Sequence, residues 1–79
     1  MNTENRVSPQ APEIEEAIIG ACLIEQGAIP LVADKLRPEM FYVLRQQVIY
    51  AAILAMYHAG IKIDILTVKE ELSHRGKLE

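Results

Sequence analysis

The sequence is poor in the residues that covalently bridge small domains or give them chemistry. Its 79 residues include one cysteine, no tryptophan and two histidines. A single cysteine, Cys22, excludes a disulfide within the chain. A zinc site is also not expected, because His58 and His74 lie far from Cys22 and from each other. We therefore expect no metal site here. We also expect no catalytic site, because the sequence offers no nucleophile paired with a general base.

Glycine is scarce as well, which bears on nucleotide binding. A phosphate-binding loop needs closely spaced glycines followed by Lys and then Ser or Thr. Gly76-Lys77 has no such Ser or Thr after it, and Glu71 stands where the first glycine of the loop belongs. We therefore expect no cofactor in this segment and no ATPase centre.

Clustered positive charge is missing too. The chain carries eight Lys and Arg against eleven Asp and Glu, a formal net charge of −3. The basic residues are spread along the sequence, whereas binding to phosphates needs several cations on one face. Direct nucleic-acid binding is not expected.

No run is long and apolar enough for a membrane span. The longest uncharged run, 46–61, is interrupted by His58 and Gly60 and is shorter than a spanning helix requires. The first twelve residues are polar and resemble no signal peptide. They predict a flexible arm over 1–12, with the helical domain over 13–79 and a cytoplasmic protein.

What the sequence does have is apolar residues at helical spacing, 51% of the chain being hydrophobic. Helices are expected at about 13–25, 28–35 and 44–59, with a fourth beginning after Asp64 or Thr67 and ending at Gly76. One further helical turn over 38–41 should insert Phe41. The predicted fold is all-α, a small orthogonal bundle of about four helices.

Two of these helices should build most of the core. The first has Pro12 at its start, where the missing N–H of proline costs nothing. Its apolar stripe consists of Ile14, Ala17, Ile18, Ala21 and Ile24. Three further apolar residues widen this stripe beyond one face: Ile19, Cys22 and Leu23. The third has no charge over 48–57, which is typical of a central helix. In the fourth, Ile65, Val68 and Leu72 should face inward, and Asp64 is the favoured cap.

Several residues allow both a chemical and a structural interpretation. Cys22 could be a nucleophile, but its apolar stripe favours a buried thiol. His58 and His74 fit the C-terminal ends of helices. The glutamates at 13, 15 and 16 suit the first turn of a helix in the same way. Tyrosines 42, 50 and 57 fit a core or an interface equally well. A helix-turn-helix is possible in principle, but its reading helix would carry Glu70 and Glu71.

Four segments in order resemble the N-terminal domain of bacterial replicative DNA helicases of the DnaB family. The run from Glu13 to Leu23 is similar to that domain's first-helix signature. The segment from Leu36 to Tyr42 resembles its L-x-P-E-D-F-Y pattern, and 48–53 fits the helix that follows. The segment from Gly60 to Leu72 resembles its G-x-P-I-D-L-x-T-V-x-E-x-L pattern, and 75–78 its R-G-x-L ending. Departures include Gln46, Met40 and Lys62, where the family usually has His, Asp and Pro.

The resemblance implies a collar domain that supports the ring of a hexameric helicase and binds the C-terminal domain of primase. The expected partners are therefore other helicase subunits and primase, with no membrane and no direct nucleic-acid contact. ATP and Mg are expected only for a separate ATPase domain. Arg45, Gln46 and Gln47 are the candidate contact residues. The alternative is a stand-alone helical adaptor or helix-turn-helix module.

The resemblance also implies that the family's helical hairpin, which follows this region, is absent from the 79 residues. We therefore expect a truncated domain. Loss of the hairpin would leave apolar surface on the first and third helices uncovered, and self-association is expected from that surface.

Overall fold

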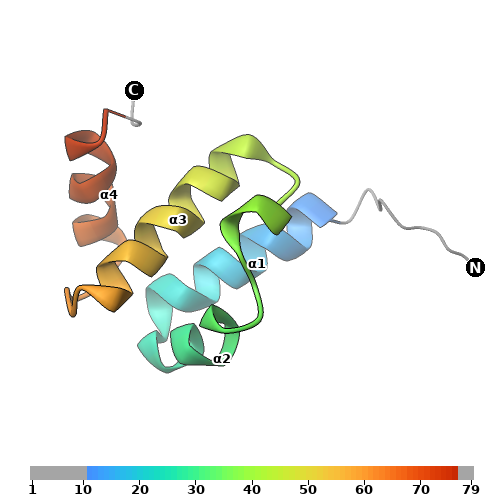
Figure 1. Ribbon diagram of the computed structural model, residues 1–79, viewed down its shortest axis with the longest axis horizontal. Helices are drawn as coiled ribbons and strands as arrows, with labels where there is room; N and C mark the ends of the chain where they lie inside the picture. Colours follow the sequence, from blue (N-terminus) through green and yellow to red (C-terminus); the bar gives the residue numbers. More distant parts are fainter. Residues whose placement is uncertain (1–10, 77–79) are drawn as a thin grey trace, which may run out of the picture.

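The computed structural model describes residues 11–76, and within them the chain is all-α (Figure 1). The elements, in order, are α1 (Ala11–Ile24), the 3-10 turn η2 (Gln26–Ala28), α2 (Ile29–Ala33), the 3-10 turn η3 (Pro38–Met40), α3 (Leu44–His58) and α4 (Ile65–His74). α1 and α3 pack against each other, and α4 packs on α3 at a steep angle. The predicted class, an all-helical bundle of about four helices, is confirmed. Residues 1–10, most of the predicted flexible arm, lie outside the described part.

α1 begins two residues earlier than expected and buries a different side. Ile19 and Cys22 are buried in the core, together with Glu15. Of the predicted stripe, Ile18 packs half-buried against the core, whereas Ile14 and Ile24 are 56% and 82% exposed. Of the residues that widen this stripe, Ile19 and Cys22 lie in the core, and Leu23 packs half-buried against it. Because α1 is apolar around most of its circumference, helical spacing alone could not choose between its sides.

The segment between α1 and α3 is more sharply folded than expected. α2 has five residues rather than the predicted eight, and η2 precedes it. It ends where the backbone N–H groups of Lys35 and Leu36 both donate to the carbonyl oxygen of Val32. The turn at η3 inserts Phe41 as predicted, and Phe41 stacks on Tyr50 with 4.8 Å between ring centroids.

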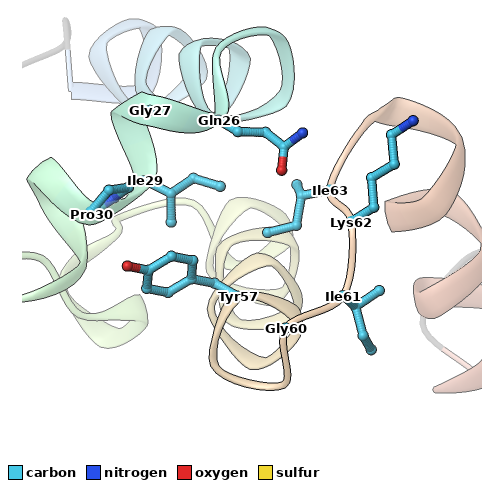
Figure 2. A pocket seen from close by; sticks show the side chains of 9 residues that line it. All are labelled: Gln26, Gly27, Ile29, Pro30, Tyr57, Gly60, Ile61, Lys62 and Ile63. Atoms are coloured by element: carbon cyan, nitrogen blue, oxygen red, sulfur yellow. The ribbon is translucent and has the colours of Figure 1, made fainter.

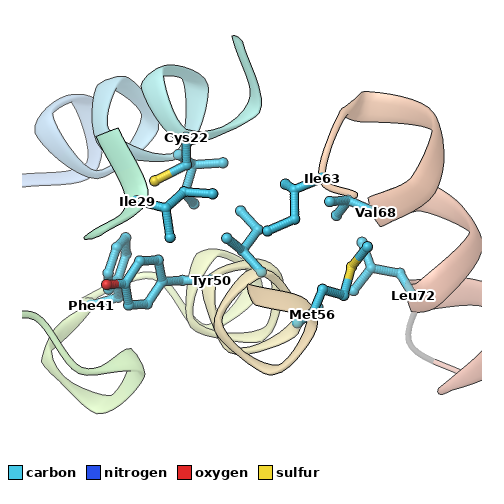
Figure 3. Packing of buried hydrophobic residues seen from close by; sticks show 11 residues of the cluster. Cys22, Ile29, Phe41, Tyr50, Met56, Ile63, Val68 and Leu72 are labelled. Carbon is cyan, nitrogen blue, oxygen red and sulfur yellow. The ribbon is translucent and has the colours of Figure 1, made fainter. Parts of the chain in front are cut away.

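α3 is the centre of the core, as predicted. It contributes the buried side chains of Tyr50, Ala52, Ile53 and Met56, around which the other elements pack (Figure 3). The hydroxyl of Tyr50 donates to the carbonyl oxygen of Leu36 at 2.9 Å, so the one polar atom of this side chain has a partner. Tyr50 is therefore a core residue that also fixes the turn before η3.

The start of α4 settles the choice between the two predicted caps in favour of Asp64. The Asp64 carboxylate accepts from the Thr67 backbone N–H at 2.8 Å, and the Thr67 hydroxyl accepts from the Asp64 backbone N–H at 2.9 Å. Val68 and Leu72 are buried as expected, but Ile65 is 66% exposed. Ile65 lines a shallow apolar cleft of about 270 Å³ between α1, α3 and α4. It therefore lies on the side of α4 that faces the other helices, as predicted, but these helices do not bury it.

Candidate protein-interaction surface

The three candidate contact residues lie in the first turn of α3, but they do not share one environment. Arg45 is exposed. Gln46 is only 8% exposed, and its Oε1 has no hydrogen-bond partner within residues 11–76. Gln47 is half-buried and donates from Nε2 to the carbonyl oxygen of Phe41 at 2.8 Å. Only Arg45 therefore presents its side chain to a partner in this conformation, and the contact role of all three stays a prediction.

A buried glutamate, Glu15, positions this turn. The sequence analysis had grouped it with Glu13 and Glu16 as residues that suit the first turn of a helix. Glu15 accepts hydrogen bonds from the backbone N–H groups of Tyr42 and Val43, the latter at 3.2 Å. Val43 is the N-cap of α3 and offers no side-chain cap of its own. Glu15 thus joins α1 to the entry of α3, and its charge lies near the positive end of the α3 dipole. The sequence signal for this role is the position of Glu15 four residues before Ile19. One helical turn separates the two residues, so both lie on the buried side of α1.

One hollow of this surface lies where α2 and η2 approach the C-terminal end of α3 (Figure 2). It has a volume of about 550 Å³. Its floor is formed by the buried side chains of Ile29 and Ile63, and Tyr57 and Ile61 border it with partial exposure. Lys62 is the only charged residue among those that line it. The hollow can accept an apolar side chain, but it brings no reactive groups together.

Large apolar side chains are also exposed over much of the remaining surface. They lie on all four α-helices and on the segments that connect them; besides Ile14 and Ile24 they are Leu31, Met40, Tyr42, Leu44, Tyr57, Ile61, Ile65 and Leu66. Of the three tyrosines, only Tyr50 is in the core. Isolated exposed apolar residues are normal, but so many on a domain this small are typical of protein-binding surfaces.

The residues with potential chemistry are kept apart from one another. Cys22 is buried, and burial raises the pKa of its thiol, which disfavours the reactive thiolate. The pKa of Asp64 is lowered, chiefly by the hydrogen bond from the Thr67 backbone N–H. Within residues 11–76 no three side chains of the His, Cys, Asp or Glu type come together as metal ligands. The described surface offers apolar contact and isolated charges.

These features define a small helical domain whose exposed chemistry suits contacts with other macromolecules. A comparison with protein families identifies the domain more closely. The model of the DnaB-like helicase N terminal domain matches residues 7–79. The chain belongs to this family.

Curated relatives agree with the assignment. The chain is 49% identical over 74 residues to the replicative DNA helicase DnaB of Rhodothermus marinus, an alignment that covers 94% of this chain and 8% of the relative. It is 36% identical over 75 residues to the replicative DNA helicase DnaC of Bacillus subtilis (strain 168), covering 95% and 16%. It is 35% identical over 74 residues to the DnaB of Geobacillus stearothermophilus, covering 94% and 16%. The chain thus spans less than a fifth of the length of these relatives.

No solved structure matches this chain at a significant level. Over the part of the chain that the structure describes, none of the helices combines the length and the apolar character needed to cross a membrane.

Proposed function

We propose that this chain is the collar domain of a hexameric replicative DNA helicase, a module that packs against other subunits and binds primase. The observation that carries the proposal is the family match over residues 7–79. The replicative helicases to which the chain is similar support it further, at up to 49% identity. ATP-driven unwinding, with its ATP and Mg, is assigned to a separate ATPase domain of the parent protein, and the protein acts in the cytoplasm.

The exposed surface is consistent with a docking role. Apolar side chains are exposed on all four helices, and the described residues bring no catalytic or metal-binding group together. Non-obligate protein interfaces combine such apolar contacts with a polar rim. Arg45, which is exposed at the start of α3, supplies a charge of the kind that steers a partner.

Primase binding is tested by titrating the chain with the C-terminal domain of the cognate primase in a calorimeter. Binding in the micromolar range is expected. Arg45→Glu should weaken it, whereas Arg37→Glu, the same change at another exposed arginine, should leave it unchanged. Equal binding by both variants would remove Arg45 from the contact, and no heat at tens of micromolar would count against primase docking by these residues.

The alternative, a helical adaptor or DNA-binding module unrelated to replication, gives a different result. Such a module would retard duplex DNA with an affinity that falls steeply as salt rises. The exposed face of α4, the reading helix of that alternative, combines Lys69 with Glu70, which is a poor surface for phosphates. We expect no retardation.

A further inference from the structure

The three residues 41–43, which join η3 to α3, belong to neither helix. Phe41 has φ −75° and ψ 138°, and Val43 has φ −88° and ψ 121°, so both have extended backbone. Backbone N–H and C=O groups that are withdrawn from water need partners wherever they lie. No strand among the described residues pairs with this segment. Side chains supply the partners instead.

Two side chains on different helices share this task. Glu15, on α1, accepts from the backbone N–H groups of Tyr42 and Val43. Gln47, on α3, donates from Nε2 to the carbonyl oxygen of Phe41 at 2.8 Å. A carboxylate can only accept and an amide NH₂ group can only donate, so each side chain suits the backbone groups that it meets. We call Glu15 and Gln47 the clasp.

The clasp lies inside the domain. Glu15 is only 7% exposed, and Gln47 is half-buried. The ring of Phe41 is fixed as well, because it stacks on Tyr50. The side chain of Tyr42 remains 67% exposed. A further segment of the parent protein that packed on this surface would therefore meet that side chain, not the groups that hold its backbone.

The first turn of α3 depends on these contacts. Val43 is the N-cap of α3, and its apolar side chain cannot accept a capping hydrogen bond. The clasp fixes the residues that lead into the helix and thereby the direction in which α3 begins. Arg45 lies two residues after Val43 and is exposed. A contact group that is already held in place loses less entropy when it binds.

We propose that Glu15 and Gln47 act as one unit that positions Arg45, so that a buried glutamate of α1 is a positioning residue for a contact made by α3. The identity of the partner, primase, rests on the proposed function. The hold on 41–43 does not. Because both side chains hold the same short segment, loss of either one should release it, and the two losses should not add.

The hold is tested by NMR on the ¹⁵N-labelled chain. Glu15→Gln keeps the size of the side chain but removes the charge, and charge-assisted hydrogen bonds are the stronger ones. The amides of Tyr42 and Val43 should then exchange with solvent at least about tenfold faster. The order parameters of 42–45 should fall below the value of about 0.85 that is typical of rigid backbone. Glu16→Gln, the same change at an exposed neighbour, is the matched control and should leave both measurements unchanged.

The second half of the clasp has its own variant. Gln47→Met keeps the length of the side chain and a good helix former but removes the donor to Phe41. It should give the same pattern of exchange, whereas Gln26→Met, at an exposed glutamine, should not. The double variant with Glu15→Gln should exchange no more than about threefold faster than the faster single variant. A double effect equal to the product of the single effects would show two independent contacts and overturn the single unit.

The effect on Arg45 is tested by calorimetric titration with the C-terminal domain of the cognate primase. Glu15→Gln and Gln47→Met should each weaken binding at least about threefold, because the complex must now immobilise the turn. Asp64→Ala removes the cap of α4 and lowers overall stability without touching 41–43. At a temperature where circular dichroism shows it folded, it should bind like the parent chain. Equal weakening by Asp64→Ala would assign the effect to lost stability.

Two further results would overturn the proposal. Unchanged exchange of the Tyr42 and Val43 amides in Glu15→Gln would show that the carboxylate does not hold the segment. Parent-like primase affinity in a variant whose 42–45 amides have become mobile would show that the clasp does not position Arg45. Failure of the parent chain itself to bind primase would instead count against the proposed function, and the exchange measurements would still decide whether the clasp exists.

Discussion

The substitution Gly20→Ala is expected to stabilise the free domain. Gly20 has helical neighbours on both sides, and alanine is more favourable than glycine in a helix interior by about 0.5–1 kcal/mol. The new methyl group meets no atom within 4 Å, so no steric cost offsets that gain. The effect combines a lower entropy of the unfolded chain with better shielding of the helix backbone.

The magnitude can be expressed as a change in melting temperature. For the residues 11–76 that the structure describes, unfolding at the midpoint has an entropy of about 0.14 kcal/mol/K, from about 2.1 cal/mol/K per residue. A gain of about 0.5–1 kcal/mol then raises Tm by about 4–7 °C. Thermal unfolding followed by circular dichroism at 222 nm, the usual helix signal, at equal protein concentration measures this shift.

The same change at Gly60 provides a control of opposite sign. Gly60 follows α3 with φ of +73°, a conformation that costs an alanine about 1–2 kcal/mol. A Cβ there also meets nothing within 4 Å, so only the backbone distinguishes the two sites. Gly60→Ala should lower Tm by about 7 °C or more. An unchanged or lower Tm for Gly20→Ala would refute the claim that the domain does not need this glycine.

Four further predictions follow from other contacts. Glu15→Ala should reduce the free energy of unfolding by about 2–3 kcal/mol in urea titrations, because two backbone N–H groups lose a charged acceptor; a loss below about 0.5 kcal/mol would contradict this role. The lowered pKa of Asp64 means that its stabilising effect is present above its unfolded pKa and is lost as the pH falls through its folded value. Between neutral pH and pH 3, melting curves of the parent chain should therefore lose more stability than those of Asp64→Asn, which keeps a capping oxygen; parallel losses would show that Asp64 is not responsible. Cys22 should react with a thiol reagent only as fast as the domain opens, so rapid labelling without denaturant would contradict its burial. Sedimentation at high protein concentration should show self-association through exposed apolar side chains such as Leu44 and Tyr57, and a strictly monomeric profile would contradict it.

The candidate surface could be predicted from the sequence only in outline. The excess of apolar residues was visible, and so was the lack of reactive groups. Which apolar residues face solvent depends on how α1 is rotated about its axis, and its spacing allowed several rotations. The hollow over Ile29 and Ile63 joins residues 26–30 to residues 57–63, so no local pattern shows it.

The sequence by itself determined the helices, their order and most of their ends. Pro38, Asp64 and Gly60 act through their own backbone or a neighbour three residues away, and α3 is so uniformly apolar that it could only be central. Only the tertiary structure decided which side of α1 is buried and where Glu15 belongs. Glu15 looked like one of three solvated glutamates, yet it bonds to backbone groups 27 and 28 residues away. That contact holds the buried side of α1 against α3 and leaves Ile14 and Ile24 exposed, because a helix that is apolar around most of its circumference can cover only one side of itself with a single neighbour.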